Sequence, residues 1–330
     1  MTIPILILLF PLIAAILIWI FGKNIPTYVA RVGVVATAIS FFISAWTLYS
    51  VSTEGPIHFI LWPSNPESSS VLKIGMWVDR LTAIMMVLIT SVSTVIHVYS
   101  IRYLEGDPGY ARFFALLSFM TFVILGLVAS PNLFMLFIFW QLLSLALYLI
   151  LAFNFSNRPA CQNAFKTFFA HRVGDVSFLC GIFLAYKYFG TLGFNDLFRL
   201  AAEKPQMISL FSGIVNISAV TAIALLVFVG AIAKSCQFPL HVWLPDTMDS
   251  PTPVSALMHA GIVNAGGFLL NRLAPFYVIS PNTLHLVFVV GLLTVLLGAS
   301  VMLVQNDIKK MLGFSTVAQM GYMIMECGLG

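Results

Sequence analysis

Long apolar runs, separated by short polar stretches, repeat along the whole chain. There are about ten runs of about 20 residues each, the length that an α-helix needs to cross a bilayer. They lack the strict alternation of barrel strands, so they predict helices. The predicted spans are residues 3–21, 28–51, 81–99, 113–129, 133–153, 173–189, 214–233, 254–273 and 284–304, and a tenth begins near residue 311.

Three stretches depart from this pattern. Residues 52–73 are rich in Pro and Ser and predict an exposed loop. Residues 157–172 place basic side chains among aromatic ones, as an interfacial helix does. Residues 234–253 hold four prolines, and each proline lacks an N–H and clashes with the preceding helical turn. This last stretch therefore predicts that the seventh helix is broken.

The composition is that of a membrane protein. The 330 residues are 60% hydrophobic and 8% charged, with a mean hydropathy of +1.00, whereas a soluble chain carries about 25% charged residues. A soluble core cannot hide this much apolar surface. In a bilayer the backbone groups must be satisfied internally, so we expect an all-α fold, a polytopic transmembrane helical bundle. The net charge of +4 gives no argument for nucleic acid.

The first and last runs bear on processing and orientation. The first lacks a basic region before it and an A-x-A-type cleavage site after it, so we interpret it as a retained span, with a cleaved signal peptide as the alternative. The tenth leaves about 20 residues, the minimum for a crossing, so the architecture is either minimal or part of a longer chain. Nine Lys and Arg lie in and beside the loops after odd-numbered spans, and six after even-numbered ones. This bias predicts a periplasmic N-terminus.

Lys234 is the first candidate for chemistry, because it follows the apolar run LLVFVGAIA and precedes the proline-rich stretch. A lysine at the centre of a spanning helix costs about 2.5–3.5 kcal/mol on insertion scales, and such residues are functional candidates by default. A buried lysine can release and regain a proton. The alternative is a lysine near the end of its span that extends to the interface.

Two histidines and one acid are further candidates for a proton path. His241 lies in the proline-rich stretch and His259 in the first turns of the eighth span, and histidine can relay protons near neutral pH. Either one can instead bond a backbone carbonyl that the break frees. Asp175 begins the predicted sixth span, where it pairs with Arg172, pairs with a neighbouring helix, or caps the helix N-terminus.

Gln141 and Glu326 complete the predicted set. Gln141 lies within an apolar helix and can bond across helices, but it cannot exchange a proton. Glu326 is either an intramembrane acid or an acid at the exposed end of the last span. Asp246 and Asp249 flank broken helix ends, where capping explains them equally well.

Metal and cofactor motifs are not found in the sequence. The four cysteines form no C-x-x-C pair, so a structural zinc site or a disulfide framework is not expected. The sequence has no G-x-G-x-x-G after a strand, no P-loop and no H-E-x-x-H. We therefore expect no cofactor in this chain.

The run GAIAKSCQFPLHVWLPDTMDSPTPVSALMHAG, residues 230–261, resembles the signature of the antiporter-like subunits of respiratory complex I and of Mrp-type cation/proton antiporters. Residues 101–120, 173–184 and 306–323 resemble the same family, most like its NADH dehydrogenase subunit 5 branch. The similarity implies an antiporter-like proton-channel core over residues 76–330, preceded by two spans and a polar loop over residues 1–75. Lys234 falls on the family's channel lysine, and His259 falls on its eighth-helix histidine.

One position departs from the family. Its fifth helix normally has Trp-Glu, and that glutamate pairs with the channel lysine, whereas this chain has Trp140-Gln141. The resemblance implies that a Glu–Lys switch cannot operate here in its usual form. Asp175 falls on an acid of the family's sixth helix and is our first choice for a substitute partner.

This departure, with residues 258–275 and 317–330, resembles the membrane subunits of DAB inorganic-carbon accumulation complexes. The resemblance implies a hetero-complex in the bacterial inner membrane with a large carbonic-anhydrase-like subunit that holds the zinc. Protons, or another cation such as sodium, would flow through the membrane subunit and drive hydration of CO2 to bicarbonate. Two alternatives stay open: a complex I or Mrp antiporter-like subunit, and a non-conducting anchor for a peripheral enzyme.

Overall fold

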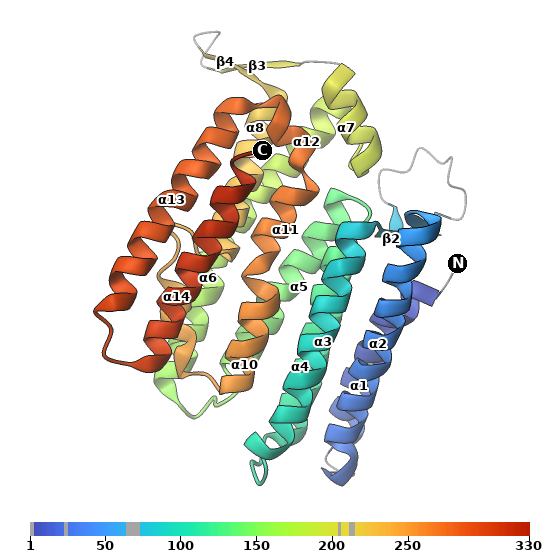
Figure 1. The fold of residues 1–330 in the computed structure, drawn as a ribbon, viewed down its shortest axis with the longest axis vertical. Helices are drawn as coiled ribbons and strands as arrows, with labels where there is room; N and C mark the ends of the chain where they lie inside the picture. Colours follow the sequence, from blue (N-terminus) through green and yellow to red (C-terminus); the bar gives the residue numbers. More distant parts are fainter. Residues whose placement is uncertain (1–2, 23–25, 64–72, 204–205, 211–214) are drawn as a thin grey trace. The chain divides into compact units, whose positions relative to one another are not determined.

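A computed structural model describes residues 3–22, 26–63, 73–203, 206–210 and 215–330 (Figure 1). Within these residues, eight helices are long and apolar enough to cross a membrane: Ile3–Phe21, Tyr28–Glu54, Arg80–Tyr103, Tyr110–Val128, Leu133–Leu151, Arg158–Phe189, Thr252–Arg272 and Pro281–Leu303. The seventh and tenth predicted spans correspond to α8 (Ala219–Lys234) and α14 (Ile308–Cys327). The prediction of an all-α, polytopic bundle is confirmed.

The chain divides into two compact units, and the first comprises residues 1–131, 135–164 and 250–261. Its helices are α1 (Ile3–Phe21), α2 (Pro26–Glu54), α3 (Arg80–Tyr103), α4 (Tyr110–Val128), most of α5 (Leu133–Leu151) and α10 (Thr252–Leu257). In Figure 1 the blue helices α1 and α2 lie side by side. The antiparallel strands β1 (Ile57–Trp62) and β2 (Ile74–Val78) join α2 to α3.

Buried hydroxyl groups hold the helices of the first unit together. Ser93 on α3 lies 2.7 Å from the hydroxyl of Thr121 on α4, and the Nε2 atom of His97 lies 3.1 Å from the hydroxyl of Ser118. All four side chains are fully buried. Such interhelical hydrogen bonds replace the hydrophobic driving force that lipid does not provide.

The second unit comprises residues 132–134, 165–249 and 262–330. Its elements are most of α6 (Arg158–Phe189), α7 (Phe194–Glu203), β3 (Met207–Leu210), β4 (Val215–Ser218), α8, α9 (Trp243–Asp246), the 3₁₀-helix η2 (Thr247–Asp249), α11 (Asn264–Arg272), α12 (Ala274–Ile279), α13 (Pro281–Leu303) and α14. The π-helical turn η3 (Met258–Ile262) lies between α10 and α11.

Several elements differ from the sequence-based expectation. The predicted interfacial helix and the sixth span form one continuous helix, α6, because no helix-breaking proline separates them after its first turn. The predicted seventh span begins later, at Ala219, since residues 215–218 form β4, which pairs with β3. Neither hairpin was predicted, and β1 occupies part of the predicted loop 52–73. Residues 64–72 of that loop lie outside the described residues.

Glycines let α13 and α14 approach closely, as Figure 1 shows for these neighbouring orange and red helices. A Cβ atom on Gly298 of α13 would lie 2.8 Å from the backbone N of Ala318 on α14. One on Gly291 would lie 2.5 Å from the backbone N of Met325. Small residues at these positions therefore allow the two backbones to touch, as is common between membrane helices.

A larger side chain at this contact should force the helices apart. We expect Gly298→Leu to lower the free energy of unfolding by about 3 kcal/mol through overpacking. Ser300→Leu is the control, because Ser300 is exposed on the same helix. Unfolding of the purified protein in mixed micelles measures both variants. Equal effects of the two substitutions would contradict the close-packing argument.

Candidate ion-path site at the helix break after Lys234

Lys234 is the last residue of α8, and its side chain is fully buried. Helix α8 ends there because the backbone turns at Cys236, which has a φ of 51° in the left-handed region. Three residues later comes Pro239, the first of the four prolines. The burial of the ammonium group favours the functional interpretation over a lysine that reaches outward to the interface.

The backbone groups freed by the break are bonded within the second unit. The indole Nε1 of Trp243 donates to the carbonyl of Ala233 at 2.9 Å, and the backbone N of Gln237 donates to the carbonyl of Ile232 at 3.0 Å. The backbone N of Phe238 donates to the hydroxyl of Thr294 on α13 at 3.0 Å. Irregular backbone inside a membrane protein requires such internal partners.

Helices α6 and α8 pack against each other through glycines. A Cβ atom on Gly174 would lie 2.4 Å from the Cβ of Ala233, and one on Gly181 would lie 3.2 Å from a methyl of Val227. A Cβ atom on Gly230 would lie 3.0 Å from the Cβ of Phe178. Higher numbers on α6 face lower numbers on α8, so the two helices run antiparallel.

Two charged residues of α6 lie close to this contact with α8. Arg172 and Asp175 form an ion pair at 2.6 Å, and the carboxylate is 5% exposed while the guanidinium is 33% exposed. The negative charge of Asp175 attracts Lys234, and the positive charge of Arg172 repels it. Asp175 therefore acts electrostatically on Lys234, and its role as the substitute partner stays a prediction. The structure rules out the helix-capping interpretation, because α6 begins at Arg158.

Sequence reasoning missed His171, which was part of the predicted interfacial helix. Its side chain is fully buried, and neither ring nitrogen has a hydrogen-bond partner within the described part of the chain. Leaving a buried polar atom unbonded costs about 1–3 kcal/mol. The ring lies edge-on to Trp243, with centroids 4.6 Å apart, and it interacts electrostatically with Lys234. Its spacing of three residues from Gly174 was the signal that could have found it.

Two other predicted residues, His241 and Glu326, also belong to the second unit. His241 is half-buried in the break, and its ring stacks on Phe238 with centroids 6.1 Å apart. Glu326 is exposed at the end of α14 and lines a cavity of about 270 Å³ with Asn271 and Cys327. A role for either side chain on an ion path stays a prediction.

Gln141 and His259 belong to the first unit. Gln141 is half-buried on α5, next to the fully buried Trp140. His259 is half-buried in η3, and π-helical turns within α-helices are frequent at functional sites. Their places on an ion path also stay predictions.

Of the two acids near the break, the structure describes the side chain of one. Asp246 forms an ion pair with Lys166 of α6. The side chain of Asp249 lies outside the described part of the structure. No group of three or more His, Cys, Asp or Glu that could hold a metal ion occurs among the residues described.

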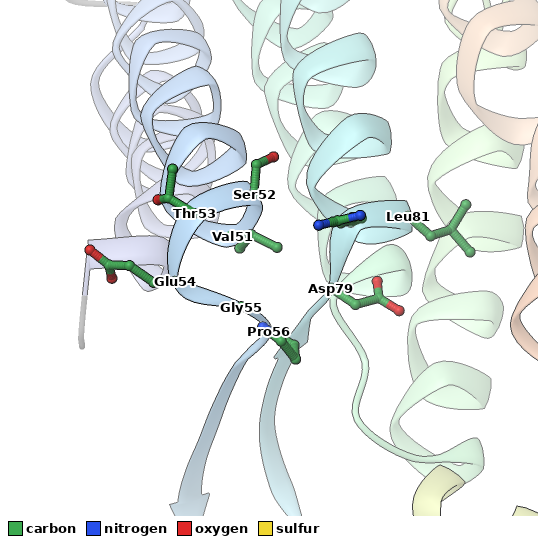
Figure 2. Close-up of a pocket in the computed structure, with 9 residues that line it drawn as sticks. Val51, Ser52, Thr53, Glu54, Gly55, Pro56, Asp79 and Leu81 are labelled. Atoms are coloured by element: carbon green, nitrogen blue, oxygen red, sulfur yellow. The ribbon is translucent and has the colours of Figure 1, made fainter.

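A cavity of about 620 Å³ lies in the first unit, where α2 ends and α3 begins. Figure 2 shows the carboxylates of Glu54 and Asp79 pointing away from each other at its edge. Asp79 caps α3 by accepting a hydrogen bond from the backbone N of Thr82 at 2.8 Å. None of the predicted path residues lines this cavity, so we place the candidate site at the break and not here.

The fold and the break define a helical, multi-spanning membrane protein with a buried lysine at an interrupted helix. The family described as NADH:quinone oxidoreductase/Mrp antiporter, TM, matches residues 130–330, and the N-terminal family of complex I chain 5 matches residues 66–114. The chain therefore belongs to the NADH:quinone oxidoreductase/Mrp antiporter family. The resemblance seen in the sequence is confirmed.

Individual relatives come from two branches. The chain is 43% identical, over 98% of its length and 56% of the relative's, to the "Probable inorganic carbon transporter subunit DabB1" of Halothiobacillus neapolitanus. It is 44% identical, over 82% of its length and 35% of the relative's, to the chloroplastic NAD(P)H-quinone oxidoreductase subunit 5 of Carpenteria californica. The chain thus spans about half the length, or less, of these curated relatives.

Two solved structures share the fold. A chain of the membrane-bound sulfane sulfur reductase, an archaeal respiratory membrane complex, has a TM-score of 0.88 at 22% identity, covering 99% of this chain and 65% of the other. A chain of the Mrp complex from Dietzia sp. DQ12-45-1b has a TM-score of 0.82 at 22% identity, covering 99% and 34%. These likenesses show a common architecture.

The hydrogen bond from the Trp243 indole to the carbonyl of Ala233 can be tested directly. We expect Trp243→Phe to lower the free energy of unfolding by about 1–3 kcal/mol, because the carbonyl of Ala233 loses its donor. Trp46→Phe is the matched control, since Trp46 is 60% exposed on α2. Unfolding of both variants in micelles measures the difference. A Trp243→Phe variant as stable as the control would show that the hydrogen bond does not hold the break.

Proposed function

We propose that this chain is a membrane energy-coupling subunit that conducts protons, or another cation, and so drives inorganic-carbon accumulation by a zinc-containing partner subunit. The observation that carries the proposal is the fully buried Lys234 at the helix break, beside the Arg172–Asp175 ion pair. The carbon branch is supported by the similarity to the DabB1 protein.

The charges around Lys234 suit a group that loads and unloads a proton. While Asp175 is bound to Arg172, its attraction for the lysine is partly offset by the cation beside it. Opening this ion pair would leave the carboxylate to stabilise the ammonium form, and closing it would favour release. Interactions between buried charges are strong because little solvent screens them. The ion pair therefore supplies a switch on α6 in a chain that has Gln141 on α5.

The proposed setting is a bacterial inner membrane, with the N-terminus on the periplasmic side. The proposed partner is a large carbonic-anhydrase-like subunit, which would hold the zinc and hydrate CO2 to bicarbonate. A second candidate function, a proton-translocating subunit of a complex I-like or Mrp-type assembly, is favoured by the similarity to NAD(P)H-quinone oxidoreductase subunit 5. A non-conducting anchor is the third possibility.

Substitution of the buried lysine separates conduction from anchoring. We expect Lys234→Ala and the apolar, similarly long Lys234→Met to abolish bicarbonate accumulation in cells, while the complex still assembles. Lys187→Ala is the control, because Lys187 is exposed in the last turn of α6. Uptake of labelled bicarbonate measures the effect. Normal uptake in assembled Lys234 variants would leave the anchor as the function.

The partner distinguishes the two conducting functions. We expect the chain, purified from its native membrane in mild detergent, to bring with it a large subunit that contains about one zinc ion. Metal analysis and mass spectrometry of the complex give the answer. Flavin and iron–sulfur subunits in place of the zinc subunit would assign the chain to a redox-driven assembly.

A further inference from the structure

His171 occupies a place in the second unit that packing alone does not explain. It is a fully buried imidazole, and neither of its nitrogens is hydrogen-bonded within the described ranges. A neutral imidazole has one donor and one acceptor nitrogen, so both capacities are unused. Buried polar groups left in this state call for an explanation such as an exchange partner or a bridging water.

The packing of α6 against α8 sets His171 level with Lys234. Gly174 contacts Ala233, and His171 lies three residues earlier on the same helical face. Because the helices run antiparallel, one turn back along α6 corresponds to one turn forward along α8. That turn leads from Gly230 to Lys234.

Trp243 fixes the ring in this position. Its indole donates to the carbonyl of Ala233 at 2.9 Å, and its plane is nearly perpendicular to that of the imidazole, with the ring centroids 4.6 Å apart. The backbone beside Lys234 and the ring of His171 are thus held by one side chain. The charged groups that act on His171 are Lys234 from α8 and Arg172 from its own helix.

We propose that His171 is the group with which Lys234 exchanges its proton. This inference rests on the proposed conducting function. It names a proton-exchange partner for Lys234, a role that Gln141 cannot fill because an amide does not exchange a proton. The ammonium of Lys234 gives one proton to an imidazole nitrogen, directly or through one water molecule, and becomes a neutral amine while His171 becomes an imidazolium. The N–H bond lost at the lysine is replaced by one at the histidine, so atoms and charge balance.

The neighbouring positive charges prevent His171 from retaining the proton. Arg172 and a protonated Lys234 both repel an imidazolium. Arg172 is itself held in an ion pair with Asp175. A proton therefore occupies His171 only when Lys234 has given it up, and it leaves when the lysine is loaded again.

Three variants test this role in the assembled complex, reconstituted in vesicles with an internal pH dye and a potassium–valinomycin potential. We expect His171→Gln, which keeps hydrogen bonding, to lower proton flux by about 100-fold, the scale of a lost proton-transfer group. His171→Phe, which keeps the ring against Trp243, should lose flux equally. His285→Gln should conduct normally, because His285 is exposed on α13.

The pH dependence of the proton flux distinguishes a role of His171 in proton transfer from a purely structural role. Flux through the unaltered complex should depend on pH, because protonation of His171 is a step of the proposed path, and the residual flux of His171→Gln should lose this dependence. Whichever of the Gln and Phe variants assembles decides the matter. Unchanged flux and pH profile in that variant, with Lys234→Met inactive, would overturn the role of His171 alone. Unchanged flux in Lys234→Met would overturn the conducting function itself.

Discussion

Backbone hydrogen bonds at the end of α8 are the constraint on which the candidate site depends. In an apolar surrounding each peptide group needs an internal partner, and a helix that stops leaves carbonyls and amides without one. Here the indole of Trp243 and the hydroxyl of Thr294 supply what the interrupted helix lacks. The break is therefore stabilised by specific side chains, and it allows Lys234 to lie inside the second unit at the end of a helix.

Helix α6 approaches α8 closely near the same break. Gly174 and Gly230 remove the side chains that would separate the two helices. Without that contact, residues one turn away on α6 could not lie level with Lys234. The glycines thus set the distance over which Asp175 and His171 act on the lysine. In this sense the electrostatics of the site depend on two residues that carry no charge.

Much of the fold could be predicted because length and hydropathy alone determine which segments suit a bilayer. The ten apolar runs all correspond to helical segments, and the break after Lys234 was visible from its prolines. The extent of α6 could not be predicted in this way, because basic and aromatic residues are typical of an interface and also tolerated in a long helix. That one difference changed the interpretation of Asp175, from a residue at a helix start to one in a helix interior. His171 was missed for the same reason.

The absence of an acid at Gln141 becomes intelligible once α6 is seen as one helix. His171 and Asp175 are four residues apart, so they share a face of α6, and a base and an acid are then available from a single helix. A lysine under the electrostatic influence of both does not depend on a carboxylate from α5. The glutamine can keep a hydrogen-bonding side chain at its position without introducing a third charge. The substitution is thus consistent with a proton path whose partners lie on α6.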